Sequence, residues 1–353
     1  MTSRLTKLVS LLRCGGCRYA AFYFVAFYVP FVATGRGSWR WVLFSAIFWF
    51  FQSLAIELTN RLSDQVEDRI NRPERTQLCE QIGFRRIKTI VSLIWLALML
   101  VWIGWIALER NLILGFNLCM GFLTALNYSY GLRLKARKYL MGFGMIVTFS
   151  GPFVTGWSTA YMNFRVAGVL DDLIHHVAPF LLVVDLFILS VAGIKDITDR
   201  KGDEQIGYRG LLVSLVTRGS VVVVLLLLLF PFLVTYLLIH LAILPARFLY
   251  LLAVLPVSLL LNLLLFLGHE DRQRRAVREL TYYYWLAFIS LALFLYDSTR
   301  TTKLSILGSW AYWILASQYL HWSGGLGMNT LRDLAGVLSR QRAGHLTSTH
   351  LQS

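Results

Sequence analysis

The sequence predicts an all-α integral membrane protein with about nine transmembrane helices. Of its 353 residues, 57% are hydrophobic and 15% are charged, a composition too apolar for a soluble protein of this length. The apolar residues form runs of roughly 17 to 25, the length that a helix needs to cross the hydrocarbon core of a bilayer. These runs show no alternation of apolar and polar residues with a period of two, which argues against a membrane β-barrel.

Nine apolar runs define the predicted helices in chain order. They cover residues 19–35, 41–58, 88–108, 111–129, 140–162, 176–194, 214–239, 248–268 and 281–297. Before them, residues 1–18 place leucines on one helical face beside basic residues, which predicts a short cytoplasmic helix at the membrane surface. We expect a helical core over 19–297 and a C-terminal tail over 298–353. The apolar segment 305–322 of this tail either re-enters the membrane, lies on it or forms a tenth crossing.

The distribution of basic residues supports this order of helices. Short cytoplasmic loops retain Lys and Arg, and with the N-terminus inside, most of the 34 basic residues fall on the inner side. Those inner segments are 1–18, 59–88, 130–139, 195–213 and 269–280. The predicted outer loops carry Arg36, Arg40, Arg110, Arg165 and Arg247. The net charge of +15 therefore belongs to loops beside a lipid bilayer, and no nucleic-acid-binding motif accompanies it. We expect a protein of a bacterial cell membrane that binds no nucleic acid.

An acidic cluster follows the second predicted helix and reads NRLSDQVEDRINRPERT over residues 60–76. Asn60, Asp64 and Asp68 are four residues apart, so on a continued helix their side chains lie on one face. Such a face forms one wall of a cation site. Four arginines between residues 61 and 75 can also pair with these acids, so an ordinary charged loop remains the alternative at this point.

A second acidic cluster, KDITDRKGDEQIGYRG over residues 195–210, follows the sixth predicted helix. Asp196, Asp199 and Asp203 again share one helical face, at spacings of three and four. This cluster comes four helices after the first one, at the same end of a predicted helix. The alternation of helices therefore places both acidic faces at matching depth on the cytoplasmic side of the membrane.

Two facing sets of carboxylates repel each other strongly unless cations lie between them. Ligands that consist only of oxygen favour a hard cation such as Mg²⁺, which commonly keeps coordination positions for water and for the phosphate of a substrate. Basic side chains beside the clusters suit the remaining phosphate oxygens. They are Arg72, Arg75, Lys135 and Lys195. A phosphate site beside long apolar helices predicts an amphiphilic substrate with an apolar tail.

Together, these motifs resemble the UbiA superfamily of intramembrane prenyltransferases. The resemblance rests on N-x-x-x-D-x-x-x-D at 60–68 with RINRPER after it, on K-D-x-x-D-x-x-G-D at 195–203, and on NYSYGLRLK at 127–135. It covers the predicted core, about residues 19–297. The chain departs from the frequent N-D-x-x-D-x-x-x-D form because Arg61 follows Asn60, so one possible acidic ligand is missing.

The resemblance implies a helical bundle around a lateral cavity, in which two Mg²⁺ ions hold an isoprenyl diphosphate whose prenyl group is transferred to an acceptor. Carried over by motif, one ion is held by Asn60, Asp64 and Asp68, and the other by Asp196, Asp199 and Asp203. The residues expected to be catalytic are Asp64, Asp68, Asp199 and Asp203. Those expected to bind the diphosphate are Arg72, Arg75, Lys135 and Lys195, with Tyr128 or Tyr130 nearby.

Several functions are compatible with these motifs. Transfer to an aromatic or similarly electron-rich acceptor is expected because most of the resembling family does this. A terpene cyclase on the same scaffold is the alternative, since it shares both motifs but lets the carbocation attack its own tail. A transporter would more naturally place its acids near mid-helix. The D-x-x-D-G-x-x-A-R run of the CDP-alcohol phosphotransferases is absent from the sequence.

Overall fold

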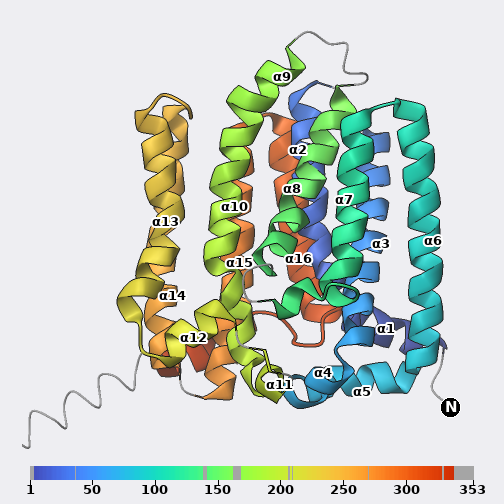
Figure 1. Cartoon of the computed structure of the whole chain (residues 1–353), viewed down its shortest axis with the longest axis vertical. Helices are drawn as coiled ribbons and strands as arrows, with labels where there is room; N and C mark the ends of the chain where they lie inside the picture. Colours follow the sequence, from blue (N-terminus) through green and yellow to red (C-terminus); the bar gives the residue numbers. More distant parts are fainter. Residues whose placement is uncertain are drawn as a thin grey trace, which may run out of the picture.

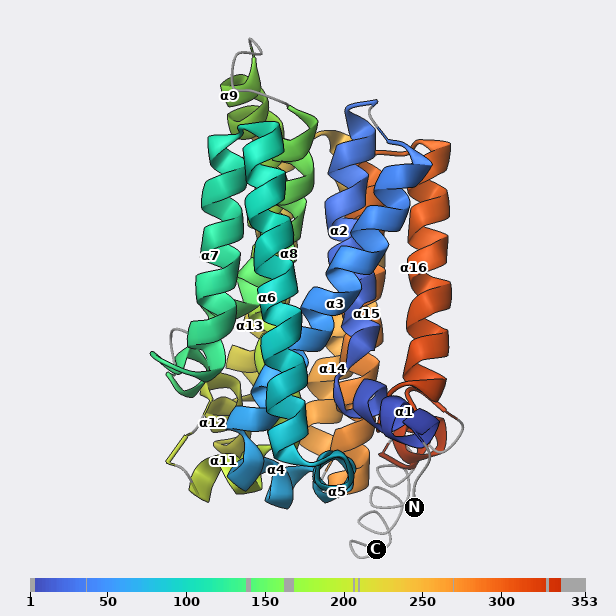
Figure 2. The ribbon, with the colours of Figure 1, turned by 90° about the vertical axis from the view of Figure 1, so that its right-hand side faces the viewer.

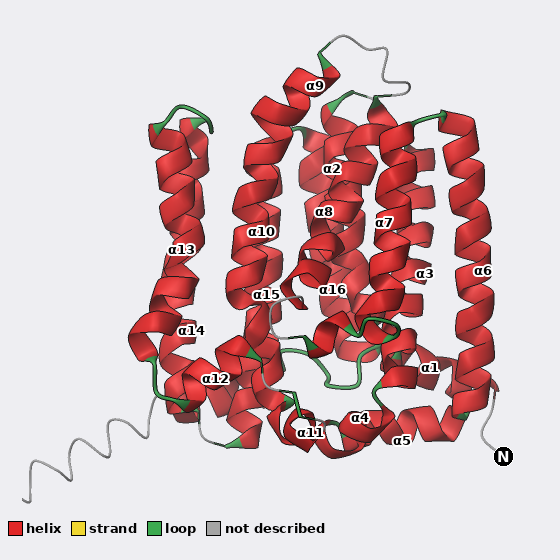
Figure 3. Ribbon diagram, viewed as in Figure 1, coloured by secondary structure: helices red, strands yellow, loops and turns green. Residues whose placement is uncertain are grey.

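The computed structural model describes residues 4–35, 37–137, 141–161, 168–205, 207–208, 210–268, 270–327 and 330–337. These residues form helices joined by turns, with no β-strand in the described ranges (Figure 3). The prediction of an all-α fold is therefore confirmed. Arg36 and Arg165, which the sequence assigned to outer loops, and the tail after residue 337 lie outside the described residues.

Long helices run side by side along the long axis of the molecule, and short ones gather at one end (Figure 1). The long helices are α2 (Ala20–Ala33), α3 (Trp39–Ser63), α6 (Phe84–Glu109), α7 (Leu112–Ser129), α8 (Met141–Ala160), α10 (Ala178–Ala192), α13 (Val221–His240), α14 (Leu255–Leu267), α15 (Asp271–Tyr296) and α16 (Arg300–Tyr319). The short α-helices are α1 (Arg4–Cys14), α4 (Gln65–Asn71), α5 (Pro73–Ile82), α9 (Val169–Asp172), α11 (Arg200–Gln205) and α12 (Leu211–Thr217). Turns of other helical types are η1 (Cys17–Tyr19), η2 (Leu134–Ala136), η3 (Leu173–Val177), η4 (Gly193–Thr198) and η5 (Ala246–Val254).

Seven helical segments in the described ranges are long and apolar enough to cross a membrane, judged by length and composition alone. They are Trp39–Ser63, Phe84–Glu109, Leu112–Ser129, Val169–Thr198, Val221–His240, Ala246–Leu267 and Asp271–Tyr296. Leu5–Cys14 and Cys17–Ala33, bent by 61° where they meet, make an eighth if they are counted as one span. Each predicted run coincides with a helix, including 140–162 with α8. The expected number of about nine is therefore approximate.

Helix α2 occupies the centre of the bundle, and its residues from Ala20 to Val32 are almost all buried. A helix that is apolar on every side is typical of such a position. One side faces α8, where a Cβ atom at Gly156 would lie 1.9 Å from the carbonyl oxygen of Phe27. Glycine is therefore required for the two backbones to approach each other, as is common between membrane helices.

The outer helices expose apolar side chains, as contact with lipid requires. On α6, Leu93, Leu100 and Leu108 are exposed, and on α13 Leu226 and Leu233 are exposed. Exposed apolar surface of this extent is unusual on a soluble protein and marks a surface covered by lipid or by another protein. This exposed apolar surface is expected of an integral membrane protein.

The polar end of the bundle is built from helices that break at the acidic clusters. Helix α3 ends at Ser63 and α4 begins at Gln65, although the Asp64 and Asp68 amides still donate to the Asn60 and Asp64 carbonyls at 2.9 and 2.8 Å. The second cluster is split further, because the 3₁₀ turn η4 ends at Thr198 and α11 begins at Arg200. In the second cluster the Asp199 and Asp203 amides likewise donate to the Asp196 and Asp199 carbonyls, at 3.0 and 3.1 Å. The expected helical spacing is thus approximately right for both clusters, although each is interrupted by a break between helices. Short polar side chains that bond to nearby backbone favour such breaks.

The segments that the sequence assigns to the inner and outer sides of the membrane lie at opposite ends of the bundle (Figure 1). Helices α4, α5 and α11 lie at one end and α9 at the other (Figure 1). We expect the first end to face the cytoplasm. In a background without the four cysteines, Asp171→Cys should react with an impermeant thiol reagent on intact cells, while Gln77→Cys should react only after permeabilisation. Both positions are exposed in the structure. Labelling of residue 77 but not 171 on intact cells would reverse the topology.

Candidate active site

A polar cavity lies at the end of the bundle that holds α4, α5 and α11, and both acidic clusters line it. The structure brings together eleven of the residues that the sequence singled out for the site. The predicted residues around this cavity are Asn60, Asp64, Asp68, Arg72, Arg75, Tyr128, Lys135, Lys195, Asp196, Asp199 and Asp203. Tyr130, the alternative to Tyr128, is exposed and does not line it. Segments more than one hundred residues apart therefore form one site.

The first cluster meets Lys135 at the end of α3. Lys135 Nζ donates to Ser63 Oγ at 3.1 Å and makes a short ion pair with Asp64. The Asn60 side-chain oxygen accepts a hydrogen bond from Ser129, the last residue of α7. The end of α7 thus contacts Asn60, and the segment after it contacts Asp64. Burial, and then the nearby charge of Arg61, lowers the pKa of Lys135 to about 7. An additional anion in the cavity would therefore favour the charged form of this lysine.

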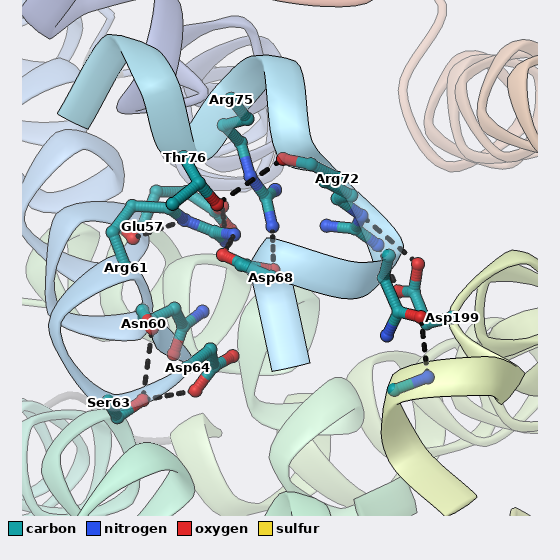
Figure 4. Close-up of polar contacts among 12 residues, drawn as sticks. Glu57, Asn60, Arg61, Ser63, Asp64, Asp68, Arg72, Arg75, Thr76 and Asp199 are labelled. Atoms are coloured by element: carbon teal, nitrogen blue, oxygen red, sulfur yellow. Dashed lines mark hydrogen bonds and ion pairs between the residues drawn. The ribbon is translucent and has the colours of Figure 1, made fainter. Parts of the chain in front are cut away.

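Asp68 is held between two arginines (Figure 4). Arg61 donates from Nη1 to Asp68 Oδ2 at 2.8 Å and from Nη2 to Glu57 Oε2 at 3.0 Å. Arg75 makes a short contact with the other oxygen of Asp68. Burial opposes the ionisation of Asp68, but the charges of Arg75 and Arg61 lower its pKa to about 2. Arg61, the residue that departs from the expected motif, is thus one of two cations that neutralise this carboxylate.

Arg72 connects the two acidic clusters. It lies at the junction of α4 and α5, where Pro73 begins the next helix and favours an extended conformation before it. From there its Nε donates to Asp199 Oδ1 at 3.1 Å, and its Nη2 makes a short contact with Oδ2 (Figure 4). This is a bidentate guanidinium–carboxylate pair, which fixes the orientation of the Arg72 guanidinium as well as balancing its charge.

The other acids of the second cluster are crowded and poorly solvated. Asp196 is buried, and its Oδ2 has no hydrogen-bond partner among the described residues. Asp203 receives a long contact of 3.5 Å from the Asn71 amide. Burial, followed by the charges of Asp199 and Asp196, raises the pKa of Asp203 to about 8. The charge of Arg72 favours the ionised form of Asp203 but does not offset burial and the repulsion from the neighbouring acids.

Gly202 allows α11 to approach α4. Its amide donates to Asn71 Oδ1 at 2.7 Å. A Cβ atom at this position would lie 2.6 Å from Asn71 Nδ2 and 2.8 Å from the backbone oxygen of Glu67. The glycine between Asp199 and Asp203 in the sequence motif is therefore needed for the two clusters to meet.

Lys195 and Tyr128 mark the inner boundary of the polar cavity. Lys195 Nζ donates to the Tyr128 hydroxyl at 3.0 Å and contacts Met145 Sδ at 3.4 Å. Both residues also line a second cavity between the helices. They therefore lie where the polar site meets the apolar interior.

The second cavity is apolar and adjoins the first. Six residues line both cavities: Tyr19, Glu57, Asn60, Tyr128, Lys195 and Tyr282. Farther into the bundle its walls include the aromatic residues Phe22, Trp49, Trp102, Phe149 and Trp285. The polar and apolar cavities thus lie side by side, as an amphiphilic ligand requires.

Several residues around the polar cavity were not predicted from the sequence, among them Arg18, Arg278, His321 and Trp322. Arg278 of α15 donates to Thr198 Oγ1 at 3.1 Å and lies 4.0 Å from Asp199. Arg18, His321 and Trp322 also line the cavity. Arg18 and Arg278 belong to basic segments used only to assign topology, while His321 and Trp322 end an apolar segment that carried no site motif. The sequence held no spacing signal that could have placed these four residues together.

The oxygen donors of the cavity fit a hard cation. Carboxylates of both clusters line it, and the partnerless oxygen of Asp196 is an unsatisfied acceptor. In this arrangement the acids pair mainly with arginine and lysine, and no three acidic, His or Cys side chains in the described ranges are close enough to hold a metal. Metal binding would therefore require some of these ion pairs to exchange partners.

Comparison with known proteins agrees with this architecture. The family model described as the UbiA prenyltransferase family matches residues 21–288. A solved structure of a digeranylgeranylglyceryl phosphate synthase in membranes aligns with a TM-score of 0.52 and 20% sequence identity. The alignment covers 82% of this chain and 98% of that one, which shows a shared fold. No curated protein sequence matches the chain.

Proposed function

This chain belongs to the UbiA prenyltransferase family, and from that premise we propose that it moves an isoprenyl group from its diphosphate to an aromatic or similarly electron-rich acceptor in the membrane. Family membership and fold support intramembrane prenyl transfer. The finer proposal concerns the substrate, the metal and the residues that act on them.

The adjacency of the polar and apolar cavities carries this proposal. An isoprenyl diphosphate has a highly charged head and an apolar tail, and the polar cavity joins the apolar one through six shared residues. The head would lie between the acidic clusters, and the tail would extend among the aromatic side chains. The bond to be broken would then lie near the boundary that Tyr128 and Lys195 form.

We assign the diphosphate to the cationic residues around the polar cavity. They are Arg72 and Arg75 at the start of α5, Lys135 in η2 and Lys195 in η4, three separate segments of the chain. Arg72 and Lys135 are already oriented by their ion pairs with Asp199 and Asp64. Guanidinium and ammonium groups fixed before the substrate arrives stabilise the charge of a leaving diphosphate at little reorganisation cost.

We propose that Mg²⁺ is held by the two clusters: Asn60, Asp64 and Asp68 in the first, and Asp196, Asp199 and Asp203 in the second. When bound, Mg²⁺ neutralises the charge that develops on diphosphate as it departs. Among these residues, Asp68 has both oxygens engaged by Arg61 and Arg75, so one of those ion pairs would have to open. Asp64, Asp68, Asp199 and Asp203 are the acids we expect turnover to depend on most.

The residues at the boundary suit the carbocation that remains. When the C–O bond breaks, both electrons leave with diphosphate, and the allylic cation needs protection from water. Tyr19, Tyr128 and Tyr282 line both cavities, and aromatic rings can stabilise a cation through their π faces. An acceptor nucleophile then forms the new carbon bond and releases a proton.

The identity of the products tests this proposal. Purified protein would be incubated with Mg²⁺ and isoprenyl diphosphates of several lengths, each with and without phenolic acceptors, and the products identified by mass spectrometry. We expect an acceptor to accelerate diphosphate consumption strongly and the product to contain both carbon skeletons. Abundant cyclic terpene formed without any acceptor would instead establish a terpene cyclase.

A further inference from the structure

The turn after α16 reaches the polar cavity, although it lies beyond residue 288, where the family match ends. Helix α16 runs beside α2 and α15 and ends at Tyr319 (Figure 2). The next residues, His321 and Trp322, line the same cavity as the two acidic clusters. Part of the segment expected as a C-terminal tail therefore belongs to the site.

The indole ring of Trp322 lies close to three arginines. The guanidinium carbons of Arg278, Arg75 and Arg72 are 5.2, 5.6 and 6.0 Å from its ring centroid. These arginines come from α15, from α5 and from the junction that precedes α5. Each distance is within the range of a cation–π contact. One ring thus contacts cations from separate parts of the chain.

The turn that carries Trp322 is anchored by a buried ion pair. Ser323 Oγ donates to Glu279 Oε1 at 3.1 Å and bonds to His321 Nδ1 at 2.7 Å. Glu279 in turn pairs with Arg18 at 2.8 Å, and both charged side chains are almost completely buried. His321 is also buried. The turn is therefore held by Glu279, which also lies 3.7 Å from Arg278, one of the arginines that the indole faces.

These arginines need a partner of this kind. Like charges close together repel each other in a poorly solvated site. Two of the acids that pair with these arginines are shared with other arginines: Asp68 also pairs with Arg61. Glu279, which lies 3.7 Å from Arg278, also pairs with Arg18. The electron-rich face of an indole attracts cations without adding an anion that would compete with diphosphate. It can therefore hold the guanidinium groups in place and leave their donors available to a ligand.

We propose that Trp322 is a positioning residue that orients Arg72, Arg75 and Arg278 for the diphosphate of the substrate, an inference that rests on the function proposed above. The C-terminal segment thereby completes the head-group site of the helical core. Trp322 acts through the arginines, so it should affect diphosphate affinity more than acceptor affinity.

Three variants test this role. Trp322→Ala removes the ring, Trp322→Phe keeps an aromatic face, and Tyr319→Ala removes an exposed aromatic side chain three residues earlier as a control. For each, we would measure the KM for isoprenyl diphosphate, the KM for acceptor, kcat, the affinity for inorganic diphosphate and the thermal stability in detergent. Binding of inorganic diphosphate needs no turnover, so it tests the site separately from the reaction.

We expect Trp322→Ala to weaken inorganic diphosphate binding and raise the KM for isoprenyl diphosphate by roughly tenfold. Trp322→Phe should recover most of this loss, and Tyr319→Ala should match the wild type. Unchanged diphosphate affinity in Trp322→Ala would overturn the inference while leaving prenyl transfer intact. Equal losses of diphosphate affinity in Trp322→Ala and Trp322→Phe, together with lower thermal stability of both variants, would also overturn it. Such a result would indicate that Trp322 has a structural role. A wild type that neither binds diphosphate nor consumes isoprenyl diphosphate would overturn the proposed function as well.

Discussion

Asp199→Asn and Asp64→Asn should each nearly abolish turnover, lowering kcat roughly 1,000-fold. Each removes a carboxylate that we expect to hold Mg²⁺ and that orients a cation, and the departure of diphosphate depends on these positive charges. Asp199 pairs with Arg72, and Asp64 with Lys135. Asparagine keeps the shape of the side chain but can neither balance these cations nor offer a charged oxygen to Mg²⁺. The measurement is the rate of prenylated product formation at saturating substrate, with protein amount and melting temperature determined in parallel.

Asp171→Asn is the matched control for these variants. Asp171 is an exposed acid at the opposite end of the bundle, beside His175. Its replacement should leave kcat unchanged, because it is far from the polar cavity. Folded Asp64→Asn or Asp199→Asn protein that retained wild-type activity would remove these residues from the proposed site.

Arg72→Ala should lower kcat/KM for isoprenyl diphosphate about 100-fold, since truncating one partner of a buried charge pair leaves the other one uncompensated. Arg72 spans the two acidic clusters through Asp199 and is largely buried. Arg72→Lys keeps the charge but not the planar fork of donors, so it should recover only part of the loss. Steady-state kinetics with isoprenyl diphosphate as the varied substrate would measure both effects.

Arg69→Ala provides a control from the same helix. Arg69 is exposed on α4 and makes a 3.4 Å ion pair with Glu80. Surface pairs of this kind contribute little to stability, so activity should remain close to that of the wild type. A similar loss in the Arg69 and Arg72 variants would indicate a general effect of positive charge near the membrane rather than a specific contact.

Hydropathy and acid spacing predicted much of this architecture because both depend on local periodicity. Apolar runs long enough to span a bilayer coincide with the helices observed. For the first cluster, the backbone bonds from Asp64 to Asn60 and from Asp68 to Asp64 preserve a helical spacing across the end of α3. The two clusters line one cavity, in agreement with the motif pairing.

The contacts between distant segments were not predictable from spacing. Asp199 pairs with Arg72, and Asp68 is enclosed by Arg61 and Arg75. The pairing of each acid with its arginine depends on how α4, α5 and α11 pack together. The spacing of residues along a single sequence does not show this packing. Trp322 shows the same limit, because an aromatic residue at the end of an apolar run is ordinarily interpreted as membrane anchoring.

A structure determined with Mg²⁺ and a non-reactive thiodiphosphate analogue of an isoprenyl diphosphate would test the central claim most directly. The account predicts density for the diphosphate between Asp64 and Asp199, in contact with Arg72 and Lys135, and density for the tail in the apolar cavity beside Phe22 and Trp285. A diphosphate bound outside the polar cavity, or a tail directed away from the apolar one, would contradict the assignment of both cavities to a single substrate.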